Sequence, residues 1–355
     1  MHRVMIHPSS YENCRIAVDH AFKLFPLEIR GKKVVIKPNV LRASQADEHI
    51  VTNPALLRAV IDAIEEMSPG GIVVGDNPGL FNYGDNENSF NQSGLMKASK
   101  GYYKNLGDSI THLPFNPDYM PEVGVSTEIL DADILISLPK FKTHGLTVMT
   151  GAVKNSYGIL PGGQKARLHQ LAGTPERFHE LIVDVFRLRV PDFFIMDAVM
   201  GMEGNGPASP ELREIGVILA ADNGVALDSV VARMMGVDPA QLRFLQKAKS
   251  HGLGDYLADK IEIDGQLKVI ENFKLPPIGG QAIADNQAVQ ELLNSRGNVK
   301  PKADPELCTT CGACVEHCPV SALTMEEIIP VVEAETCISC FCCQEICPEK
   351  AMSLS

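Results

Sequence analysis

The feature that most constrains this chain is a cysteine pattern that occurs twice near its C-terminal end. The first run reads Cys308-x2-Cys311-x2-Cys314-x3-Cys318-Pro319, and the second reads Cys337-x2-Cys340-x2-Cys343-x3-Cys347-Pro348. Every member of the second run lies 29 positions after its counterpart, as 308 to 337 shows. Thiolates at this spacing on a tight loop can converge on one iron–sulfur cube and bind three of its irons. Zinc sites and disulfides are the alternatives, but a zinc site needs only four ligands, usually in two pairs, and the duplicated runs fit that poorly.

Residues 304–355 resemble the bacterial two-cluster ferredoxin domain, in which the fourth ligand of each cluster comes from the other run. Cys342 directly precedes Cys343, and the spacing from Cys340 favours Cys343 as the ligand. Cys14 stands alone and is expected to be a buried thiol. The resemblance implies two [4Fe–4S] clusters with crossed ligands, one held by Cys308, Cys311, Cys314 and Cys347, and the other by Cys337, Cys340, Cys343 and Cys318.

The negative charge of the chain is concentrated in the same region. The formal net charge is −12, and residues 304–355 contribute −8 of it, since they carry nine carboxylates against Lys350 alone. An acidic surface argues against nucleic acid and fits docking to a basic redox partner protein, although it could also be merely solvated. No apolar run is long enough to span a bilayer, and the N-terminus lacks the pattern of a signal peptide. Thiolates that hold oxygen-sensitive clusters fit a reducing compartment, so we expect a cytoplasmic protein with no membrane contact.

Ahead of this region, short apolar runs alternate with helical patterns. Strands are expected at 34–39, 72–79, 134–138, 193–197 and 217–222. Asn53-Pro54 and Thr174-Pro175 have the composition of helix starts, and Gly236 of a helix end. The alternation predicts an α/β fold, with a mostly parallel sheet that has helices on both faces. A small C-terminal ferredoxin-like α+β iron–sulfur domain completes the chain.

The domain boundaries follow from composition. We expect one α/β domain over residues 1–300, in which residues 80–120 form an insertion or a lid. A helix is expected over 285–293, and residues 294–303 are expected to be the linker into the iron–sulfur domain over 304–355.

Polar residues recur where four of the expected strands end, at Lys37-Pro38-Asn39, Asp76-Asn77-Pro78-Gly79, Pro139-Lys140 and Asp197. In open α/β sheets the carboxyl ends of the strands form the ligand crevice. Each group alone could be turn chemistry, because these residue types are common in turns. Their recurrence predicts a ligand crevice at this edge of the sheet.

A segment without carboxylates overlaps this predicted crevice. Residues 134–175 contain no Asp or Glu in 42 positions, although the chain has 44 in 355. Cations without acids make a positive local field, as a site for a carboxylate or a phosphate requires, whereas a solvated loop is the alternative. No Walker, dinucleotide-binding, zinc-protease or nucleophile-elbow motif occurs in the chain. The cationic and histidine residues of the segment are Lys140, Lys142, Lys154, Lys165, Arg167, His144 and His169.

Four motifs together resemble the domain-of-unknown-function family numbered 362, over about residues 30–240. Members of that family often carry a two-cluster ferredoxin tail. The stretch from Gly151 to Gly162 is also similar to a glycine-rich loop of nickel-pincer lactate racemases, but the chain lacks a paired-histidine signature to match. The motifs are Lys37-Pro38-Asn39, Gly75-Asp76-Asn77-Pro78-Gly79, Pro139-Lys140-Phe141-Lys142-Thr143-His144 and Thr150-Gly151-Ala152-Val153-Lys154-Asn155.

These observations predict a ferredoxin-linked oxidoreductase that reduces an anionic substrate or a cofactor precursor over Lys140–Gly163. In this hypothesis Lys142 and Lys154 bind anionic oxygens, and His144 donates a proton because histidine titrates near neutral pH. The other residues expected at the crevice are Lys37, Asn39, Asp76, Lys140 and Asn155.

Two other functions fit the same sequence. The first is an electron-transfer or assembly factor that feeds electrons to a partner protein and has no substrate chemistry of its own. The second is an isomerase or transferase whose clusters are structural.

Overall fold

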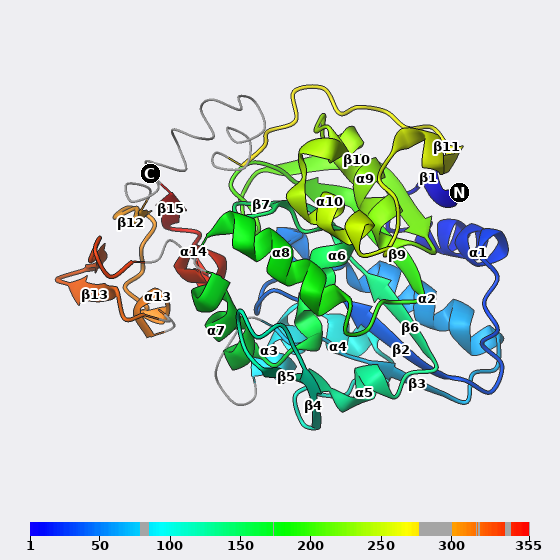
Figure 1. Cartoon of the computed structure of the whole chain (residues 1–355), viewed down its shortest axis with the longest axis horizontal. Coiled ribbons are helices and arrows are strands. Elements are labelled where there is room, and N and C mark those ends of the chain that lie inside the picture. The colour runs from blue at the N-terminus through cyan, green and yellow to red at the C-terminus, as the bar shows by residue number, and fades with distance from the viewer. Residues whose placement is uncertain are drawn as a thin grey trace.

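The computed structural model describes residues 1–78, 85–172, 174–276, 300–316, 318, 320–337 and 342–354. Within these residues the main feature is one mixed sheet that runs through the centre of the larger part of the molecule (Figure 1). Its strands lie in the order β11 (Ile261–Gly265), β1 (His2–Pro8), β10 (Leu212–Ala221), β9 (Phe193–Met202), β6 (Ile134–Leu138), β2 (Lys33–Pro38) and β3 (Gly71–Val74).

Most of the strand pairs are parallel. β9, β6, β2 and β3 pair in parallel, and β1 pairs in parallel with β11. β10 is antiparallel to both of its neighbours. β7 (Lys140–His144) pairs in parallel with β9 and turns back into the short β8 (Val148–Met149). The expected mostly parallel α/β sheet is therefore confirmed, and the five expected strands are among its members.

Alternate residues of each strand point to opposite faces of the sheet, so each face has its own core. In β2, Val34 and Ile36 pack on one side, and Val35 packs on the other. The first side is covered by α1 (Cys14–Leu24), α2 (Pro54–Glu66) and α4 (Leu95–Ala98). The second is covered by α6 (Gly151–Asn155), α8 (Pro175–Phe186), α9 (Gly224–Met234) and α10 (Arg243–Ser250).

The helices begin where the sequence predicts. The Asn53 side chain accepts a hydrogen bond from the Ala55 N–H at 2.9 Å at the start of α2. Thr174 accepts one from the Arg177 N–H at 3.3 Å at the start of α8. A proline follows each cap, where its missing N–H costs nothing. Gly236, with φ of 79°, lies just after the end of α9.

The described part of the expected insertion at 80–120 has secondary structure. Its helices are α3 (Asp85–Gln92) and α4, and β4 (Ile110–Pro114) pairs with β5 (Glu122–Ser126) in a separate two-stranded sheet. Helix α5 (Thr127–Leu130) follows directly. The remaining described elements of the α/β domain lie outside this insertion. They are α7 (Gly162–Ala172) and the 3-10 turns η1 (Ala46–Glu48), η2 (Ser156–Ile159), η3 (Pro239–Gln241) and η4 (Ala258–Lys260).

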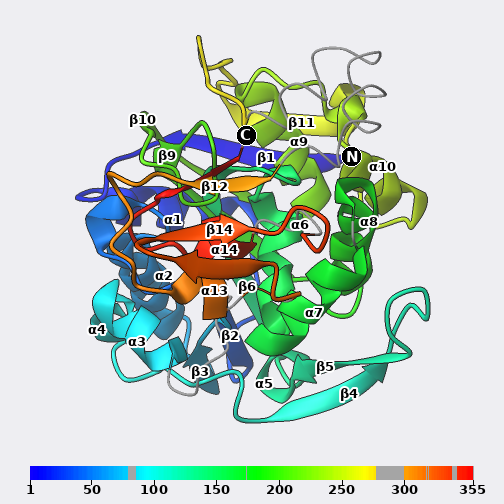
Figure 2. The same ribbon diagram turned by 90° about the vertical axis from the view of Figure 1, so that its left-hand side faces the viewer.

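Residues 301–354 form a small α+β unit, which we call the cluster unit. Its antiparallel pairs are β12 (Pro301–Ala303) with β15 (Met352–Leu354), and β13 (Leu323–Glu326) with β14 (Ile329–Val332). Its helices are α13 (Ala313–Glu316) and α14 (Cys342–Ile346). Figures 1 and 2 show the unit at one end of the molecule, opposite the N-terminus, with α14 on the side that faces the α/β domain.

The structure moves one expected boundary. Because residues 301–303 pair with β15, they belong to the cluster unit and not to the linker expected over 294–303. The helix expected over 285–293 lies outside the described residues. In the described ranges, no helix combines the length and the apolar character that crossing a membrane requires.

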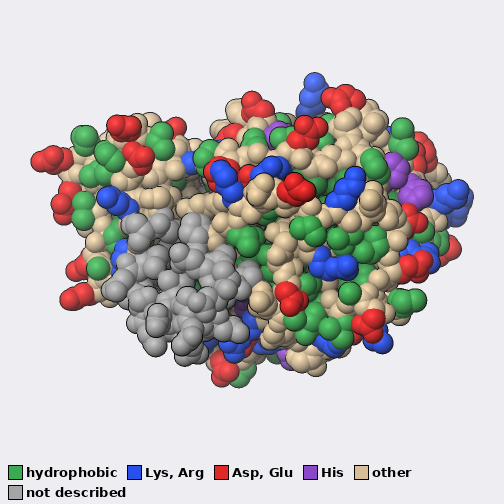
Figure 3. Space-filling model, turned by 90° about the horizontal axis from the view of Figure 1, so that it is seen from above, with side chains coloured by type: hydrophobic (Ala, Val, Ile, Leu, Met, Phe, Trp, Pro, Cys, Tyr) green, Lys and Arg blue, Asp and Glu red, His purple; other side chains and the backbone are tan. Residues whose placement is uncertain are grey.

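Acidic side chains are frequent on the surface of the cluster unit. Figure 3 shows them over the left-hand lobe, where basic side chains are few. The exposed carboxylates of this unit are Glu306, Glu316, Glu326, Glu327, Glu333, Glu335 and Glu349.

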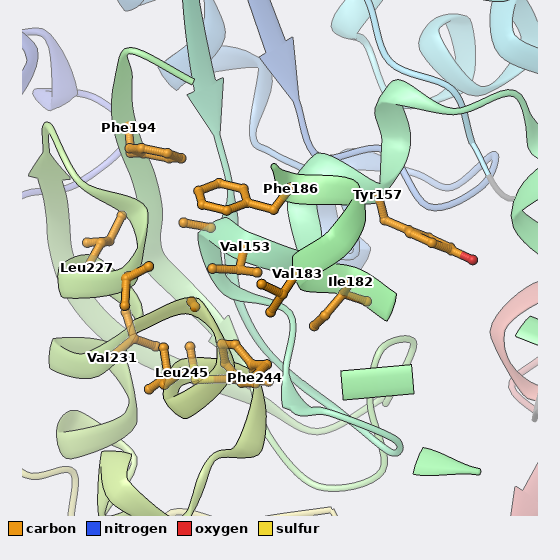
Figure 4. Close-up of a cluster of buried hydrophobic side chains, with 14 of the residues drawn as sticks. Val153, Tyr157, Ile182, Val183, Phe186, Phe194, Leu227, Val231, Phe244 and Leu245 are labelled. Atoms are coloured by element: carbon orange, nitrogen blue, oxygen red, sulfur yellow. The ribbon is translucent and has the colours of Figure 1, made fainter. Parts of the chain in front are cut away.

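The largest core lies between the sheet and the helices α6, α8, α9 and α10 (Figure 4). Val153 of α6, Phe186 of α8 and Leu227 of α9 are fully buried in it, and Phe194 contributes from β9. Helix α6 is short, so it is held in place chiefly by this packing. The core therefore positions the loop and helix between β8 and α7.

Replacing Leu227 by alanine should lower the free energy of unfolding by about 2–5 kcal/mol, because the substitution leaves a cavity among residues that cannot close around it. The same replacement at Leu257, which is 39% exposed, should change it by less than about 0.5 kcal/mol. Anaerobic urea unfolding followed by circular dichroism measures both. Equal losses in the two variants would contradict the assigned core.

Candidate functional site

A cavity of about 780 Å³, including its open mouth, lies at the carboxyl ends of β2 and β3. We call it the ligand cavity. The α/β domain supplies most of its wall, from the loops after β2 and β3, from β7, from the segment between β8 and α7, from α7 itself and from Pro207. Helix α14 of the cluster unit supplies the rest. The lining residues are Asn39, Val40, Leu41, Asp76, Asn77, Lys142, Thr150, Lys154, Asn155, Tyr157, Gly158, Lys165, Ala166, His169, Pro207, Cys342 and Ile346.

A buried ion pair supports the wall of this cavity, and its carboxylate is part of the lining. The Lys37 ammonium lies 2.7 Å from the Asp76 carboxylate, and both side chains are almost completely buried. The carboxylate also accepts hydrogen bonds from the Val40 N–H at 2.7 Å and the Asn77 N–H at 2.9 Å. Burial lowers the pKa of Lys37 and raises the pKa of Asp76, while their mutual attraction opposes both shifts. The pair joins the end of β2 to the end of β3.

Gly158 allows the next segment to approach this pair. A β-carbon at this position would lie 2.7 Å from the Lys37 ammonium and would overlap the Asp76 carboxylate. The Gly158 carbonyl accepts hydrogen bonds from Asn77, from its N–H at 3.3 Å and from its side-chain amide at 3.1 Å. A glycine is required here because of close approach to neighbouring groups.

Two amides connect the ion pair to the cavity wall. The Asn155 side-chain oxygen accepts from the Lys37 ammonium at 3.4 Å and from the Asn39 amide nitrogen at 2.9 Å. The Asn155 amide nitrogen donates to the Ser137 hydroxyl at 2.9 Å. The expected crevice residues Asn39, Asp76 and Asn155 therefore meet at the ligand cavity, and Lys37 lies directly behind them.

Three lysines line the cavity in the described part of the chain. The Lys142 ammonium donates to the Ile50 carbonyl at 2.8 Å. The Lys154 ammonium lies 5.7 Å from the centre of the Phe178 ring. Lys165 donates to the Asn77 and Pro78 carbonyls, the latter at 2.9 Å. A cluster of cations beside one paired carboxylate suits a ligand with negative charge.

The structure places the two histidines of this segment differently. His144 does not line the cavity; its Nδ1 accepts hydrogen bonds from the Leu146 N–H at 3.1 Å and the Thr147 N–H at 3.4 Å. A nitrogen that accepts two N–H groups holds the ring in one tautomer, which is a structural arrangement. His169 of α7 lines the cavity instead, with its ring stacked 4.1 Å from Phe178.

Lys140 also lies away from the cavity at which it was expected. Its ammonium donates to the Asp197 carboxylate at 2.8 Å and to the Tyr11 hydroxyl at 3.1 Å. Tyr11 donates to the other Asp197 oxygen at 3.0 Å, and the Asn53 N–H donates to Asp197 at 2.8 Å. Burial lowers the pKa of Lys140 and raises the pKa of Tyr11. This network joins β7, β9 and the start of α2, so Lys140 has a structural environment.

Helix α14 closes one side of the ligand cavity through contacts with the α/β domain. Gln344 donates to the Asn205 carbonyl at 3.1 Å. The buried Arg42 guanidinium lies 3.4 Å from the Pro348 carbonyl and 3.6 Å from the Glu48 carboxylate, and burial lowers its pKa. These bonds position Cys342 and Ile346 at the cavity.

The cluster unit has a separate cavity of about 330 Å³, which we call the cysteine cavity. Cys308, Cys311, Cys314 and Cys347 all line it, and this is the grouping that crossed ligation predicts. Its other walls are largely apolar and include Met325, Pro330, Ala351 and Met352.

The details around these thiols fit an iron–sulfur cluster. The Ala351 N–H donates to Cys347 Sγ at 3.2 Å, and the Ala322 N–H donates to Cys318 Sγ at 3.2 Å. Such N–H···S bonds stabilise the negative charge of cluster sulfurs. The described residues contain no group of three or more His, Cys, Asp or Glu arranged around a single metal ion.

The remaining cysteines are placed as follows. Cys318, Cys337 and Cys343 belong to the described residues, and Cys340 lies outside them. Cys14 lies buried at the start of α1, far from the two cysteine runs in sequence. Burial raises the pKa of its thiol to about 11, and its Sγ donates to the Tyr11 carbonyl at 3.4 Å.

Sequence reasoning missed several residues of the ligand cavity. Lys165 was counted among the cations of the segment without carboxylates but was not expected at the crevice, and neither was Cys342. Both line the cavity. Helical spacing of Lys165 and His169, four positions apart on α7, was the available signal, since such residues share one helix face. No signal in the sequence indicated Cys342.

Helix α6 is anchored by a buried carboxylate of α9. Asp228 accepts hydrogen bonds from the Ala152 N–H at 2.6 Å and the Val153 N–H at 2.9 Å. Burial raises the pKa of Asp228 to about 7, although the two N–H bonds oppose the shift. Lys154 and Asn155 follow on the same helix, so this carboxylate positions part of the cavity wall.

Cysteine pairs test the grouping around the cysteine cavity. Removing either of two residues that hold the same cluster removes the same iron. The double variant with Cys308→Ser and Cys347→Ser should therefore lose no more iron than either single variant. Cys308→Ser combined with Cys318→Ser should lose more, because those residues are assigned to different clusters. Iron and sulfide analysis after anaerobic reconstitution measures the losses. Additive losses in the first pair would contradict crossed ligation, and Cys342→Ser should leave the iron content unchanged.

The raised pKa of Asp228 predicts a pH effect on stability. A carboxyl group with a raised folded-state pKa stabilises the fold most below its unfolded pKa, and the contribution is lost as the pH rises through about 7. Asp228→Asn removes this titration. From pH 5.5 to 6.5 the free energy of unfolding of wild type should therefore fall by about 1 kcal/mol relative to the variant. Anaerobic denaturant titrations measure it, and a pH-independent difference would show that the carboxylate is already ionised at pH 5.5.

Comparison with known proteins extends these observations. The family described as a domain of unknown function (DUF362) matches residues 34–233, and a 4Fe-4S dicluster domain matches residues 300–348. The chain is thus an iron–sulfur protein of the ferredoxin type that binds 4Fe–4S. It is 31% identical over 263 residues to a thylakoid-associated protein from Synechocystis sp.. The matched region covers 70% of this chain and 77% of that protein.

Two solved structures share part of the fold at low similarity. The lactate racemase apoprotein from Thermoanaerobacterium thermosaccharolyticum has a TM-score of 0.45 and 12% identity, covering 66% of this chain and 57% of its own. A protein from Thermotoga maritima has a TM-score of 0.40 and 12% identity, covering 69% and 60%. Since the first family match spans more than half of the sequence, the chain belongs to the DUF362 family and carries a C-terminal 4Fe–4S dicluster domain.

Proposed function

We propose that this protein is an oxidoreductase that reduces a small anionic ligand in the ligand cavity with electrons carried by two [4Fe–4S] clusters. One observation carries the proposal. The lining of the cavity combines Lys142, Lys154 and Lys165 of the α/β domain with Cys342 and Ile346 of α14. Helix α14 contains Cys343 and ends one residue before Cys347. These two cysteines are assigned as ligands of the two clusters. A ligand in the cavity would therefore lie beside the redox groups.

The number of clusters rests on the two cysteine runs. The four cysteines assigned to one cluster all line the cysteine cavity. Cys318 and Cys347, which occupy equivalent positions in the two runs, each accept an N–H···S bond. Every assigned ligand is cysteine, which supports electron transfer over substrate binding at iron. The clusters, when bound, would supply electrons one at a time.

The ligand cavity has groups for both charge and protons. Lys142, Lys154 and Lys165 would hold the negative charge of the ligand. His169 would hold a proton at the cavity, because a histidine ring nitrogen can carry and donate a hydrogen. It takes the role expected of His144, which does not line the cavity. The reaction would add two electrons and two protons to the ligand: a reduced redox protein supplies the electrons through the clusters, His169 supplies one proton, and water supplies the other.

The surface of the cluster unit supports docking of that redox protein. Besides its exposed carboxylates it exposes four large apolar side chains, Leu307, Met325, Ile328 and Val331. Protein interfaces combine exposed apolar side chains with charged ones that steer the partner. We propose a partner with a basic surface, in the reducing cytoplasm that oxygen-sensitive clusters require.

The same surface supports a second candidate function, in which the protein passes electrons to a client protein and reduces no small molecule. Purification under anaerobic conditions distinguishes the two. A bound small molecule supports the reductase, whereas a stoichiometric partner polypeptide without one supports the electron-transfer factor.

Lysine variants test the anion site. A charge-assisted hydrogen bond is worth about 1.5–3 kcal/mol, so Lys142→Met and Lys154→Met should each weaken anion binding by about ten- to a hundredfold. Lys97→Met is the matched control, because Lys97 is exposed on α4 and does not line the cavity. Methionine keeps the apolar stem of lysine, which limits damage to folding.

The measurement is anaerobic thermal melting against phosphates, carboxylates and acyl phosphates, since a ligand raises the melting temperature by mass action. Binding anions are then mixed with the dithionite-reduced protein, and oxidation is followed by visible absorbance. If no anion raises the melting temperature, or if Lys142 and Lys97 variants behave alike, the proposed site is wrong.

A further inference from the structure

We propose that the ligand carries a hydroxyl or N–H group beside its negative charge, and that this group donates a hydrogen bond to the Asn39 side-chain oxygen. The inference rests on the ligand site proposed above and specifies its substrate class. Asn39 lines the ligand cavity and is 9% exposed, and its Oδ1 has no hydrogen-bond partner among the residues that the structure describes. A buried acceptor without a partner costs free energy, so its presence at a cavity indicates a donor on the ligand.

The orientation of the Asn39 amide follows from its neighbours. An ammonium group can only donate, so the Asn155 atom that faces Lys37 must be the oxygen. That same oxygen lies 2.9 Å from the Asn39 amide, which must therefore present its nitrogen to Asn155. The Asn155 nitrogen is then directed to the Ser137 hydroxyl, as observed. The buried charge of Lys37 thus leaves the Asn39 oxygen as an acceptor for another group.

A second buried group at the cavity supports this class of ligand. Thr150 is 3% exposed and lines the cavity, and its hydroxyl has no hydrogen-bond partner in the described part of the chain. Its side chain does not cap α6, which begins at the next residue. A hydroxyl can both donate and accept, so it can pair with either the oxygen or the hydrogen of a ligand hydroxyl. Asn39 requires a donor, and Thr150 accommodates the same group.

The combination defines a chemical class. The lysines of the cavity favour a carboxylate or a phosphate, while Asn39 and Thr150 favour a hydroxyl, amide or amine on the same small molecule. A site built around a hydrogen-bonding substrate group rejects the analogue without that group, because its own buried polar atoms are then left unpaired. The site should therefore distinguish hydroxylated anions from their deoxy analogues by about ten- to a hundredfold in affinity.

Two matched pairs of probes test this inference: glycolate against acetate, and glycerol 3-phosphate against propyl phosphate. Affinities are measured by anaerobic calorimetry on the cluster-loaded protein. In wild type the hydroxylated member of at least one pair should bind about ten- to a hundredfold more tightly. Asn39→Leu and Thr150→Val should remove that preference and leave the affinity of the deoxy member within about threefold of wild type.

The control variant is Thr143→Val. The Thr143 hydroxyl is also buried without a hydrogen-bond partner among the described residues, but Thr143 does not line the cavity, so this variant should keep the full preference. Thr150→Val removes no side-chain hydrogen bond to a described residue, which keeps the test valid if Asn39→Leu fails to fold. Equal binding of both members of each pair would overturn the inference and leave the anion site standing. A preference that persists in Thr150→Val and Asn39→Leu would overturn the assignment to these residues, and binding of no probe would overturn the anion site as well.

Discussion

The ligand cavity depends on the buried ion pair between Lys37 and Asp76. Burying two charges is costly, and it is tolerated only when the geometry is good and the remaining polar atoms are satisfied. Here the carboxylate accepts two backbone N–H groups besides the ammonium, at 2.7 and 2.9 Å. The pair joins the ends of two parallel strands and fixes the amides of Asn155 and Asn39 in turn. The buried charge of Lys37 thus fixes the orientation of the Asn39 amide and leaves its oxygen available at the cavity.

The second constraint is the position of the cluster unit. Helix α14 carries Cys342 and Ile346 into the wall of the ligand cavity, and the contacts of Gln344 and Arg42 hold it there. Electrons pass efficiently only over short distances, so a redox domain that shares a wall with a ligand site is suited to reduction. This arrangement is what separates the reductase proposal from that of a freely moving electron carrier.

Much of the fold could be predicted because apolar runs and helix caps are local signals. Asn39 and Asp76 were expected at the crevice because strand ends of a parallel sheet meet at one edge, and Asn155 because it lies in the segment without carboxylates. The same reasoning put Lys140 at the crevice, but Lys140 does not line the ligand cavity. Its position depends on the pairing of β7 with β9, which sets it against Asp197, a residue 57 positions away. The cavity wall from α14 likewise depends on contacts between distant segments, such as Gln344 with Asn205, which leave no pattern in the sequence.

The most direct test of the account is the affinity of the tightest-binding anion in the oxidised and in the dithionite-reduced protein. An electron added about 10 Å from a bound anion repels it by roughly 1–2 kcal/mol at an effective dielectric constant near 20. Reduction should therefore weaken binding by about five- to thirtyfold, and by linkage the anion should lower the reduction potential by the same free energy. Identical affinities in the two states would show that the anion and the clusters are far apart, and would contradict a ligand cavity shared by the two domains.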